Sequence, residues 1–300
     1  MQVLIVIAVL LPFALVVAAG VFIQRHFARD RRRSPLNLTL FHTPGEQLRR
    51  KLLKLDEEFQ AHLVMLAIAG PIVGVSWLGM KITEIGWSNV SFKYFDLFLL
   101  LGLLVVMALW MRKVMLLGKE MRSYREGLAA ELAVGQCLME VAEKGCPVLH
   151  DIPADDFNID HVVIGSHAVF AIETKSRKKP ESGGKENARV LFDGKSLRFP
   201  LHSETKPLDQ SRANARWLAI YLNGELGAPV RVVPVLALPG WFIEYSKEGA
   251  HSDVLVHNCK VPSFATWDRY GEPIGDKLKG RIRFSLCKRY EIEENRMRPK

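Results

Sequence analysis

The stretch "NIDHVVIGSHAVFAIETK", residues 158–175, decides the fold that this sequence predicts. It contains two β-rich apolar runs joined at 165–167, a pattern that is typical of a hairpin. Apolar residues occupy both alternating positions of each run, so both faces of the hairpin are apolar. Such a strand pair belongs in the middle of a sheet that is covered on both sides. The stretch therefore predicts an α/β domain.

Charged residues stand where the two runs end. A two-residue turn at Ser166-His167, or a four-residue turn over 165–168, pairs Asp160 directly with Glu173 and puts Lys175 on the same face. A three-residue loop breaks this pairing unless a bulge restores it, and the sequence leaves the choice open. Facing carboxylates repel unless a cation lies between them. Their oxygens suit Mg²⁺ or Mn²⁺ as the cofactor, and Lys175 could activate water or stabilise charge that develops on a phosphate.

The Glu-Thr-Lys triplet of 173–175 occurs a second time, at 204–206. No strand-like run precedes the second copy and Pro207 follows it directly, so this copy is predicted to be a solvated loop. Position at the end of a central strand, rather than the triplet itself, makes 173–175 a candidate site.

Residues 126–143, "EGLAAELAVGQCLMEVAE", show the periodicity of an amphipathic helix. Glu131 falls in line with Val134, Leu138 and Val141. Periodicity alone favours a glutamate at the edge of this stripe that reaches water along its own stem.

Several motifs together carry a family resemblance. "EGLAAE", "VLHDI", "NIDHVVIG", "VFAIETK" and "PLDQSRANARWL" stand in the order and spacing of the NERD (nuclease-related) domain, which belongs to the PD-(D/E)xK restriction-endonuclease-like superfamily. The resemblance covers roughly 122–240, and more loosely 254–267. It implies a central mixed sheet flanked by helices. His167 replaces the usual turn glycine and Ala130 the second glycine of the helix motif; the first departure leaves the turn geometry open.

The resemblance also implies the site residues. Matched position by position, the catalytic candidates are Glu131, Asp160, Glu173, Lys175 and Gln210, and those expected to hold the metal are Asp160, Glu173 and Glu131. The reading of Glu131 as a site residue comes from this resemblance.

A basic segment lies between the hairpin and Gln210. Seven of its cations are candidates for contacts with nucleic acid phosphates: Arg177, Lys178, Lys179, Lys185, Arg189, Lys195 and Arg198. A solvated, mobile loop is an equally good interpretation of the same residues. Asp193-Gly194 is predicted to form a hairpin turn within the segment.

The first third of the chain is predicted to be a membrane region, 1–112. Apolar runs at 2–23, 62–80 and 95–111 are candidate transmembrane helices. The first is interpreted as an uncleaved anchor because no basic segment precedes it. A cytosolic domain is expected over 113–290, followed by a polar tail at 291–300.

Basic residues predict the orientation. The loop 24–61 holds nine Lys and Arg, whereas 81–94 holds two. The positive-inside rule then places the N-terminus and 81–94 outside, and 24–61 and the domain in the cytoplasm, in a multi-pass protein of the inner (plasma) membrane. The net charge of +9 suits a polyanionic partner or an anionic membrane surface. The four cysteines include no Cys-x-x-Cys pair, which argues against a zinc site.

The function predicted from these features is a membrane-anchored, Mg²⁺-dependent endo- or exodeoxyribonuclease that hydrolyses phosphodiester bonds. One alternative is a catalytically silent nucleic-acid-binding module on a membrane anchor. A second is a membrane scaffold whose α/β domain binds protein.

The charge asymmetry generates a topology prediction. A cysteine introduced at Ser88 should react with a membrane-impermeant thiol reagent added outside the cell, and one at Ser34 should not. The reverse pattern would contradict the predicted orientation.

Overall fold

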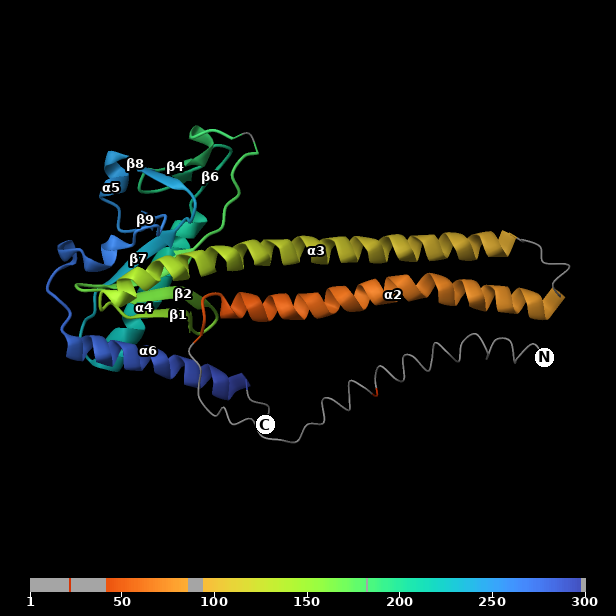
Figure 1. Cartoon of the computed structure of the whole chain (residues 1–300), viewed down its shortest axis with the longest axis horizontal. Helices are drawn as coiled ribbons and strands as arrows, with labels where there is room; N and C mark the ends of the chain where they lie inside the picture. Colours follow the sequence, from red (N-terminus) through yellow and green to blue (C-terminus); the bar gives the residue numbers. More distant parts are fainter. Residues whose placement is uncertain (1–21, 23–41, 86–93, 182, 298–300) are drawn as a thin grey trace. The chain divides into compact units, whose positions relative to one another are not determined.

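The computed structural model describes residues 22, 42–85, 94–181 and 183–297 (Figure 1). The chain divides into two compact units. The first comprises Met1–Leu38 and Lys54–Met121, and the second comprises Thr39–Leu53 and Arg122–Lys300. The span predicted at 2–23 lies outside the described residues except for Phe22.

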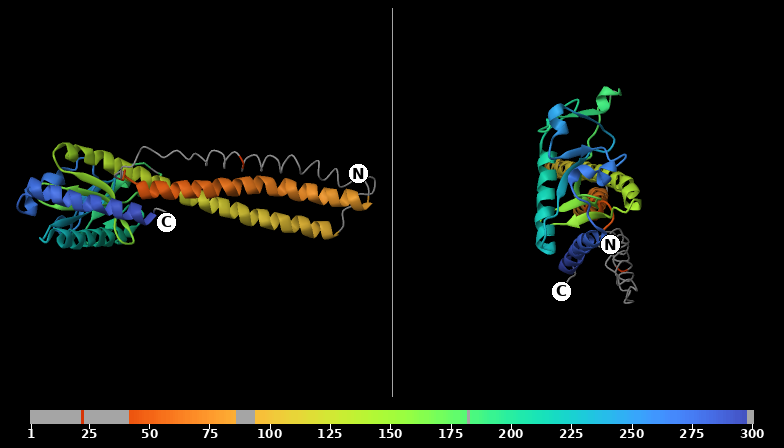
Figure 2. Two further views of the ribbon diagram at one scale, coloured as in Figure 1. Left: turned by 90° about the horizontal axis from the view of Figure 1, so that it is seen from below. Right: turned by 90° about the vertical axis from the view of Figure 1, so that its left-hand side faces the viewer.

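Apart from Phe22, the described residues of the first unit lie in two long helices, which also extend into the second unit. They are α2, Glu46–Ile85, and α3, Tyr94–Glu143, which run alongside one another (Figures 1 and 2). Both are long and apolar enough to cross a membrane, by length and composition alone. Large apolar side chains such as Phe98 and Leu109 are exposed along them. The predicted spans 62–80 and 95–111 are therefore candidate spans within α2 and α3, and the three-span arrangement stays a prediction.

Polar side chains join α2 to α3 inside the first unit. Lys81 Nζ lies 2.7 Å from Asp96 Oδ2, and Trp77 Nε1 donates to Asp96 Oδ1 at 3.0 Å. Further along, Trp110 Nε1 donates to His62 Nδ1 at 2.9 Å. Lys81 and Asp96 are both buried. Charged groups among apolar helices must be paired to remain charged, and this pair meets that requirement.

The segment predicted as the loop 24–61 is helical from Glu46 onward. Leu48, Leu52, Leu55 and Phe59 recur at helical spacing, and all four are partly buried. The helical periodicity was missed in the sequence because basic residues stand between these apolar positions. The first turns of α2, up to Leu53, belong to the second unit rather than to a separate membrane region.

The second unit is built on a five-stranded mixed sheet with the order β1-β2-β3-β7-β9. β1 pairs with β2 and β2 with β3 in antiparallel fashion, whereas β3 with β7 and β7 with β9 are parallel. The strands are β1 Val148–Pro153, β2 Asn158–Ile164, β3 Val169–Thr174, β7 Val232–Ala237 and β9 Leu255–His257. This is the mixed central sheet that the resemblance implies.

Helices cover both faces of the sheet. Phe170 and Ile172 pack with the end of α3, whereas Val169 and Ala171 pack with α4 and α6. These last two helices span Lys206–Leu226 and Asp276–Met297. The prediction of an α/β domain from the doubly apolar hairpin is confirmed. The predicted polar tail at 291–300 is helical as far as Met297.

A smaller four-stranded sheet has the order β6-β5-β4-β8. Its strands are β4 Arg189–Phe192, β5 Leu197–Arg198, β6 Ser203–Glu204 and β8 Phe242–Tyr245; the remaining short helices are η2 Glu186–Ala188, α5 Lys247–Ala250, η3 Ser263–Thr266 and η4 Asp268–Tyr270. β4 and β5 form the hairpin predicted at Asp193-Gly194, with Gly194 at a φ of 89°.

The β2–β3 register settles the turn that the sequence left open. Ile164 stands opposite Val169 and His161 opposite Ile172. Gly165 N–H donates to Ala168 O at 2.9 Å, so the chain reverses over Ser166-His167. The three-residue loop does not occur, and the same register continued by one position brings Asp160 opposite Glu173.

The prediction for the second Glu-Thr-Lys copy is wrong. Glu204 lies in β6, and Lys206 is the first residue of α4. Pro207 marks a helix start here rather than a loop, because the first turn of a helix does not require the N–H that proline lacks. The triplet therefore spans the junction between a strand and a helix.

Close packing at the β2–β3 turn generates a stability prediction. A Cβ on Gly165 would lie 2.5 Å from Ala265 O and 2.7 Å from the Phe170 ring. Gly165→Ala should therefore lower the free energy of unfolding of the full-length protein by ~1–3 kcal/mol, as overpacking does in other cores. Urea unfolding in detergent, followed by circular dichroism, measures the change.

Gly224→Ala is the matched control, because Gly224 lies in α4 and a Cβ added there would meet nothing within 4 Å. Alanine favours the helical conformation more than glycine does, so this substitution should raise the free energy of unfolding by up to ~1 kcal/mol. Equal changes in the two variants would contradict the argument from packing.

Candidate active site

The end of the β2–β3 hairpin brings two carboxylates together. Thr174 N–H donates to Asp160 Oδ2 at 2.6 Å, which fixes the Asp160 side chain against β3. Glu173 is 2% exposed, and every residue of β3 is buried. The covered strand that the apolar pattern predicted is thus what removes these carboxylates from water.

Both oxygens of Glu173 have partners. Lys175 Nζ donates to Oε1 at 2.5 Å, and Asn214 Nδ2 donates to Oε2 at 2.7 Å. Asn214 comes from α4 and is itself buried. The ammonium group compensates the buried charge of Glu173, and the amide satisfies the oxygen that the ammonium does not reach.

Glu131 reaches the same place from α3 and is 8% exposed. Burial raises the pKa of Glu131 to about 8, and the charges of Asp151 and Glu173 add to this rise while Lys175 opposes it. The edge position that periodicity favoured for Glu131 is therefore wrong. Its stripe neighbours pack in the core, and the tight packing carries the glutamate inward with them.

The pKa of Asp160 also lies well above its ordinary value. Burial is the largest cause, followed by the charges of Glu173 and Glu131, whereas the Thr174 N–H and Lys175 act in the opposite direction. Asp160 keeps some exposed surface, but protein surrounds most of its carboxylate. Three carboxylates from α3, β2 and β3 thus act on one another, and Lys175, which contacts Glu173 directly, is a cation whose charge acts on all three.

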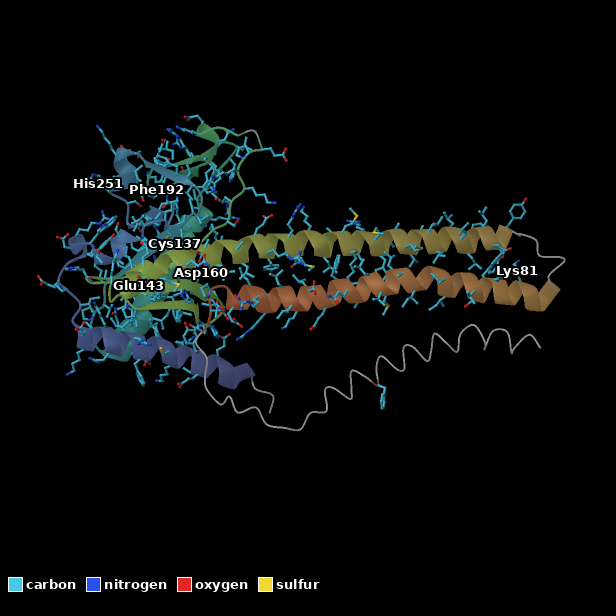
Figure 3. All side chains as sticks on the ribbon, in the orientation of Figure 1. Lys81, Cys137, Glu143, Asp160, Phe192 and His251 are labelled. Atoms are coloured by element: carbon cyan, nitrogen blue, oxygen red, sulfur yellow. The ribbon has the colours of Figure 1, made fainter. Side chains whose placement is uncertain are left out.

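These groups line an open cleft of about 430 Å³, which also takes in Gln210 on the exposed side of α4. Figure 3 labels Asp160 within the second unit. Six carboxylates line the cleft, against three cations, so it favours a positively charged ligand. The carboxylates are Glu126, Glu131, Asp151, Asp156, Asp160 and Glu173, and the cations are Lys51, Lys175 and Arg177.

Asp151 is a cleft residue that the sequence argument missed. It is 3% exposed and adopts a left-handed backbone with a φ of 50°. Its carboxylate accepts the Gln47 N–H and the Asn158 Nδ2, both at 2.7 Å. His42 Nδ1 lies 3.0 Å from the Asp151 carbonyl oxygen. A charged residue inside the strand-like run "VLHDI" was the signal that could have identified it.

Gln47 and Lys51 were missed because they lie far upstream in a segment assigned to the membrane region. The Gln47 N–H is free to reach Asp151 because the first N–H groups of a helix have no partner within the helix. Asn214 did leave a signal: it follows Gln210 by four residues, and residues at that spacing share one face of a helix.

The basic segment does not gather at the cleft. Of the seven predicted phosphate contacts, Arg177 alone lines it in the part of the chain that the structure describes. Arg177 donates to both oxygens of Glu204, at 2.8 and 2.9 Å. Three others also meet carboxylates: Lys178 with Glu126, Arg189 with Glu244, and Arg198 with Asp193. Lys179 Nζ stands 5.8 Å from the Trp241 ring centre.

The donor set of the cleft is one that a hard divalent ion prefers, because it offers carboxylate oxygens. Within residues 42–85, 94–181 and 183–297, however, no group of three or more His, Cys, Asp or Glu side chains is placed to hold an ion together. Both carboxylate oxygens of Glu173 already accept hydrogen bonds, from Lys175 and Asn214, and one oxygen of Asp160 accepts the Thr174 N–H. Binding of a metal by Glu131, Asp160 and Glu173 would therefore require their side chains to rearrange.

Residues 126–239 match the family model described as the nuclease-related domain, NERD. No curated protein and no solved structure gives a significant match to the chain. The matched range contains Glu131, Asp160, Glu173, Lys175 and Gln210. The chain thus carries a nuclease-related domain at 126–239, and its helix-flanked mixed sheet is consistent with the PD-(D/E)xK superfamily.

The raised pKa of Glu131 generates a prediction about stability and pH. A carboxyl with a higher pKa in the folded than in the unfolded chain binds more protons when folded, so its contribution to stability is lost as pH rises from about 4.5 to about 8. One group changes the free energy of unfolding by at most ~1.4 kcal/mol per pH unit. Glu131→Gln should flatten this fall, and the variant should be more stable than the parent at pH 8.5.

Urea unfolding of the full-length protein in EDTA, at pH 4.5, 6.5 and 8.5, provides the measurement. Glu140→Gln is the control, since Glu140 is exposed on the same helix. An unchanged pH profile in Glu131→Gln would contradict the buried placement of the Glu131 carboxyl.

Proposed function

We propose that the second unit is a metal-dependent nuclease that hydrolyses phosphodiester bonds, in DNA, and that α2 and α3 anchor it to a membrane. The single observation that supports this most strongly is the cluster of Glu131, Asp160 and Glu173 around Lys175; all four residues lie in the range that matches the nuclease-related domain, and all four line the cleft. Such a cluster is costly to bury for stability alone, which argues that it serves chemistry.

In this proposal Asp160 and Glu173 hold Mg²⁺ or Mn²⁺, with Glu131 as the third ligand. The ion, when bound, supplies positive charge against the carboxylates and polarises a phosphoryl oxygen. The high pKa values of Asp160 and Glu131 fit this role, because the repulsion that raises them is what a cation would relieve.

Lys175 is proposed to act on the phosphate and on the attacking water. Its ammonium is partly exposed at the cleft while one N–H holds Glu173 Oε1, so its remaining N–H groups can face the substrate. A positive donor there stabilises negative charge that develops on the phosphoryl oxygens. Gln210 is exposed and lines the cleft, and its amide is proposed to orient the substrate or water.

Lys51 and Arg177 are proposed to contact the flanking phosphates. Lys51 is exposed, and its ammonium stands 6.0 Å from the Tyr124 ring centre. Arg177 is bound to the Glu204 carboxylate, so a contact with DNA would replace that carboxylate with a phosphate. The second Glu-Thr-Lys copy thus takes part indirectly, by holding a cation at the lip of the cleft.

The silent nucleic-acid-binding module is the second candidate. It is favoured by the occupied oxygens of Glu173 and by the lack, among the described residues, of a ready-made metal-binding group. A lysine locked on the glutamate would then serve stability only. The nuclease is the stronger proposal because Asn214 and Lys175 satisfy Glu173 without removing the repulsion at Asp160 and Glu131.

The proposed anchor has α2 and α3 as spans, in a plasma membrane with the second unit in the cytoplasm. The start of α2 and the end of α3 both belong to the second unit, so the two helices leave it and return to it. A pair of spans connected in this way agrees with the charge rule, which places 24–61 and the domain on one side.

The nuclease proposal predicts loss of cleavage on removal of the metal or of its ligands. Full-length protein in detergent should cleave DNA with Mg²⁺ and not with EDTA, and Asp160→Ala and Glu173→Ala should abolish cleavage. Lys175→Met should slow the chemical step by ~10²–10³-fold, as loss of one well-placed electrostatic group does. Plasmid and end-labelled linear DNA together separate endo- from exonucleolytic products.

Lys206→Met is the matched control, because it removes an exposed lysine from the second copy of the triplet. It should change the rate by no more than a few-fold, whereas Glu204→Gln is no neutral control because it releases Arg177. Cleavage that persists in EDTA or in Asp160→Ala would falsify the metal-dependent mechanism. DNA binding without turnover would favour the silent module, and no DNA affinity would favour a protein-binding scaffold.

A further inference from the structure

The second unit contains another hollow, of about 740 Å³, away from the acidic cleft. Its wall includes 231–234 at the beginning of β7, whereas the cleft lies where β7 ends, beside the pairing of Thr174 with Ala237. The wall also includes His257, which pairs with Ala237, so the hollow extends along β9; in the described part of the chain, the hollow and the cleft share no lining residue. His251 at this hollow and Asp160 in the cleft are labelled well apart in Figure 3.

The charge of this hollow is opposite to that of the cleft. Arg231 and Arg269 line it, and Asp253 is the one carboxylate in its described lining. Arg212 already compensates Asp253 with two bonds of 2.9 Å, from Nε to Oδ2 and from Nη2 to Oδ1. Among the described residues, neither Arg231 nor Arg269 forms an ion pair with a carboxylate. The hollow is therefore cationic.

Tyr270 orients both arginines. Arg269 Nη2 donates to the Tyr270 hydroxyl at 2.9 Å, and Arg231 Nη1 donates to the Tyr270 carbonyl oxygen at 3.0 Å. The Arg269 guanidinium also lies 4.2 Å from the centre of the Trp267 ring. A guanidinium has five N–H donors, and these contacts account for one in each arginine. The two guanidinium groups are held against the rings of Trp267 and Tyr270, and their remaining N–H donors are available to an anion.

An aromatic surface and a neutral donor complete the hollow. Tyr245 is 39% exposed although its hydroxyl accepts the Val256 N–H at 3.1 Å, so its ring is fixed and still accessible. His257 Nδ1 accepts the Cys259 N–H at 2.8 Å, which leaves the ring proton on Nε2. Burial lowers the pKa of His257, so the ring is a neutral donor.

We propose that this hollow is a binding site for a nucleoside phosphate, with the phosphates on Arg231 and Arg269 and the base against Tyr245. Guanidinium groups match phosphate oxygens in geometry as well as in charge, and aromatic rings stack on nucleobases. The volume is that of a small-molecule site. The proposal does not depend on nuclease activity, because it uses none of the cleft residues.

Isothermal titration calorimetry on the full-length protein in detergent tests the proposal, with ADP, adenosine and inorganic phosphate as separate probes. EDTA is present throughout, so that metal-assisted binding of nucleotide in the acidic cleft does not contribute. ADP should bind at least about tenfold more tightly than adenosine or phosphate. Arg231→Met and Arg269→Met should each weaken ADP binding by about tenfold or more, the loss expected for a charge-assisted hydrogen bond.

Arg216→Met is the matched control, because Arg216 is exposed on α4 and does not line the hollow; its affinity for ADP should equal that of the parent. Arg269 packs on Trp267, so Arg231→Met carries the test if thermal unfolding shows that Arg269→Met is misfolded. Glu173→Ala should bind ADP like the parent, even if all nuclease activity is absent, which separates this site from the cleft.

Three results would overturn the proposal. The first is the absence of ADP binding at millimolar concentration. The second is equal affinity for phosphate and ADP, which would indicate a general anion site. The third is arginine-dependent binding of a thymidine oligonucleotide without binding of ADP, which would assign the hollow to a nucleic acid strand.

Discussion

Repulsion between buried carboxylates is the constraint on which the cleft depends. Glu131, Asp160 and Glu173 approach one another on three different elements, and each would be less costly in water. They stay because the covered sheet and the end of α3 hold them there, while Lys175 and Asn214 satisfy Glu173. The helix–sheet core thus stabilises the fold strongly enough to keep an electrostatically unfavourable cluster. A bound cation would relieve this repulsion, and for that reason the proposed function assigns a metal ion to the cleft.

The start of α2 is as much a part of this arrangement as the nuclease-related domain itself. Asp151 adopts a left-handed backbone, accepts the Gln47 N–H and raises the pKa of Glu131 through its charge. A non-glycine residue in that conformation persists when its surroundings determine it, and here a helix terminus supplies the partner. The segment 42–53 therefore closes one wall of the cleft, and a fragment that begins at residue 113 would lose that wall. The second unit therefore includes residues upstream of the predicted spans at 62–80 and 95–111.

The sequence predicts the centre of the fold well and its margins poorly, for physical reasons. Apolar residues at both alternating positions of 158–175 leave one solution, a covered central hairpin, and the register then places Asp160 by Glu173. Glu131 could not be placed by periodicity, since a single polar residue in a stripe is compatible with both an edge and a site. The role of Glu204 was missed because Pro207 is as typical of a helix start as of a loop. The pairing of Arg189 with Glu244 joins residues far apart in sequence, and local patterns carry no signal of it.

Such long-range ion pairs, rather than the overall composition, determine where the second unit carries unpaired charge. The chain has a formal charge of +9, yet its cleft holds twice as many carboxylates as cations. Several cations of the basic segment 177–198 form ion pairs with Glu126, Glu204 and Glu244, which lie outside it. No motif singles out Arg231 and Arg269. Neither is paired with Asp253, the nearby carboxylate, because Asp253 is bound to Arg212. Free cationic groups are therefore identified by which carboxylates are already satisfied. By this criterion the hollow along β9, rather than the basic segment 177–198, is the stronger site for a phosphate.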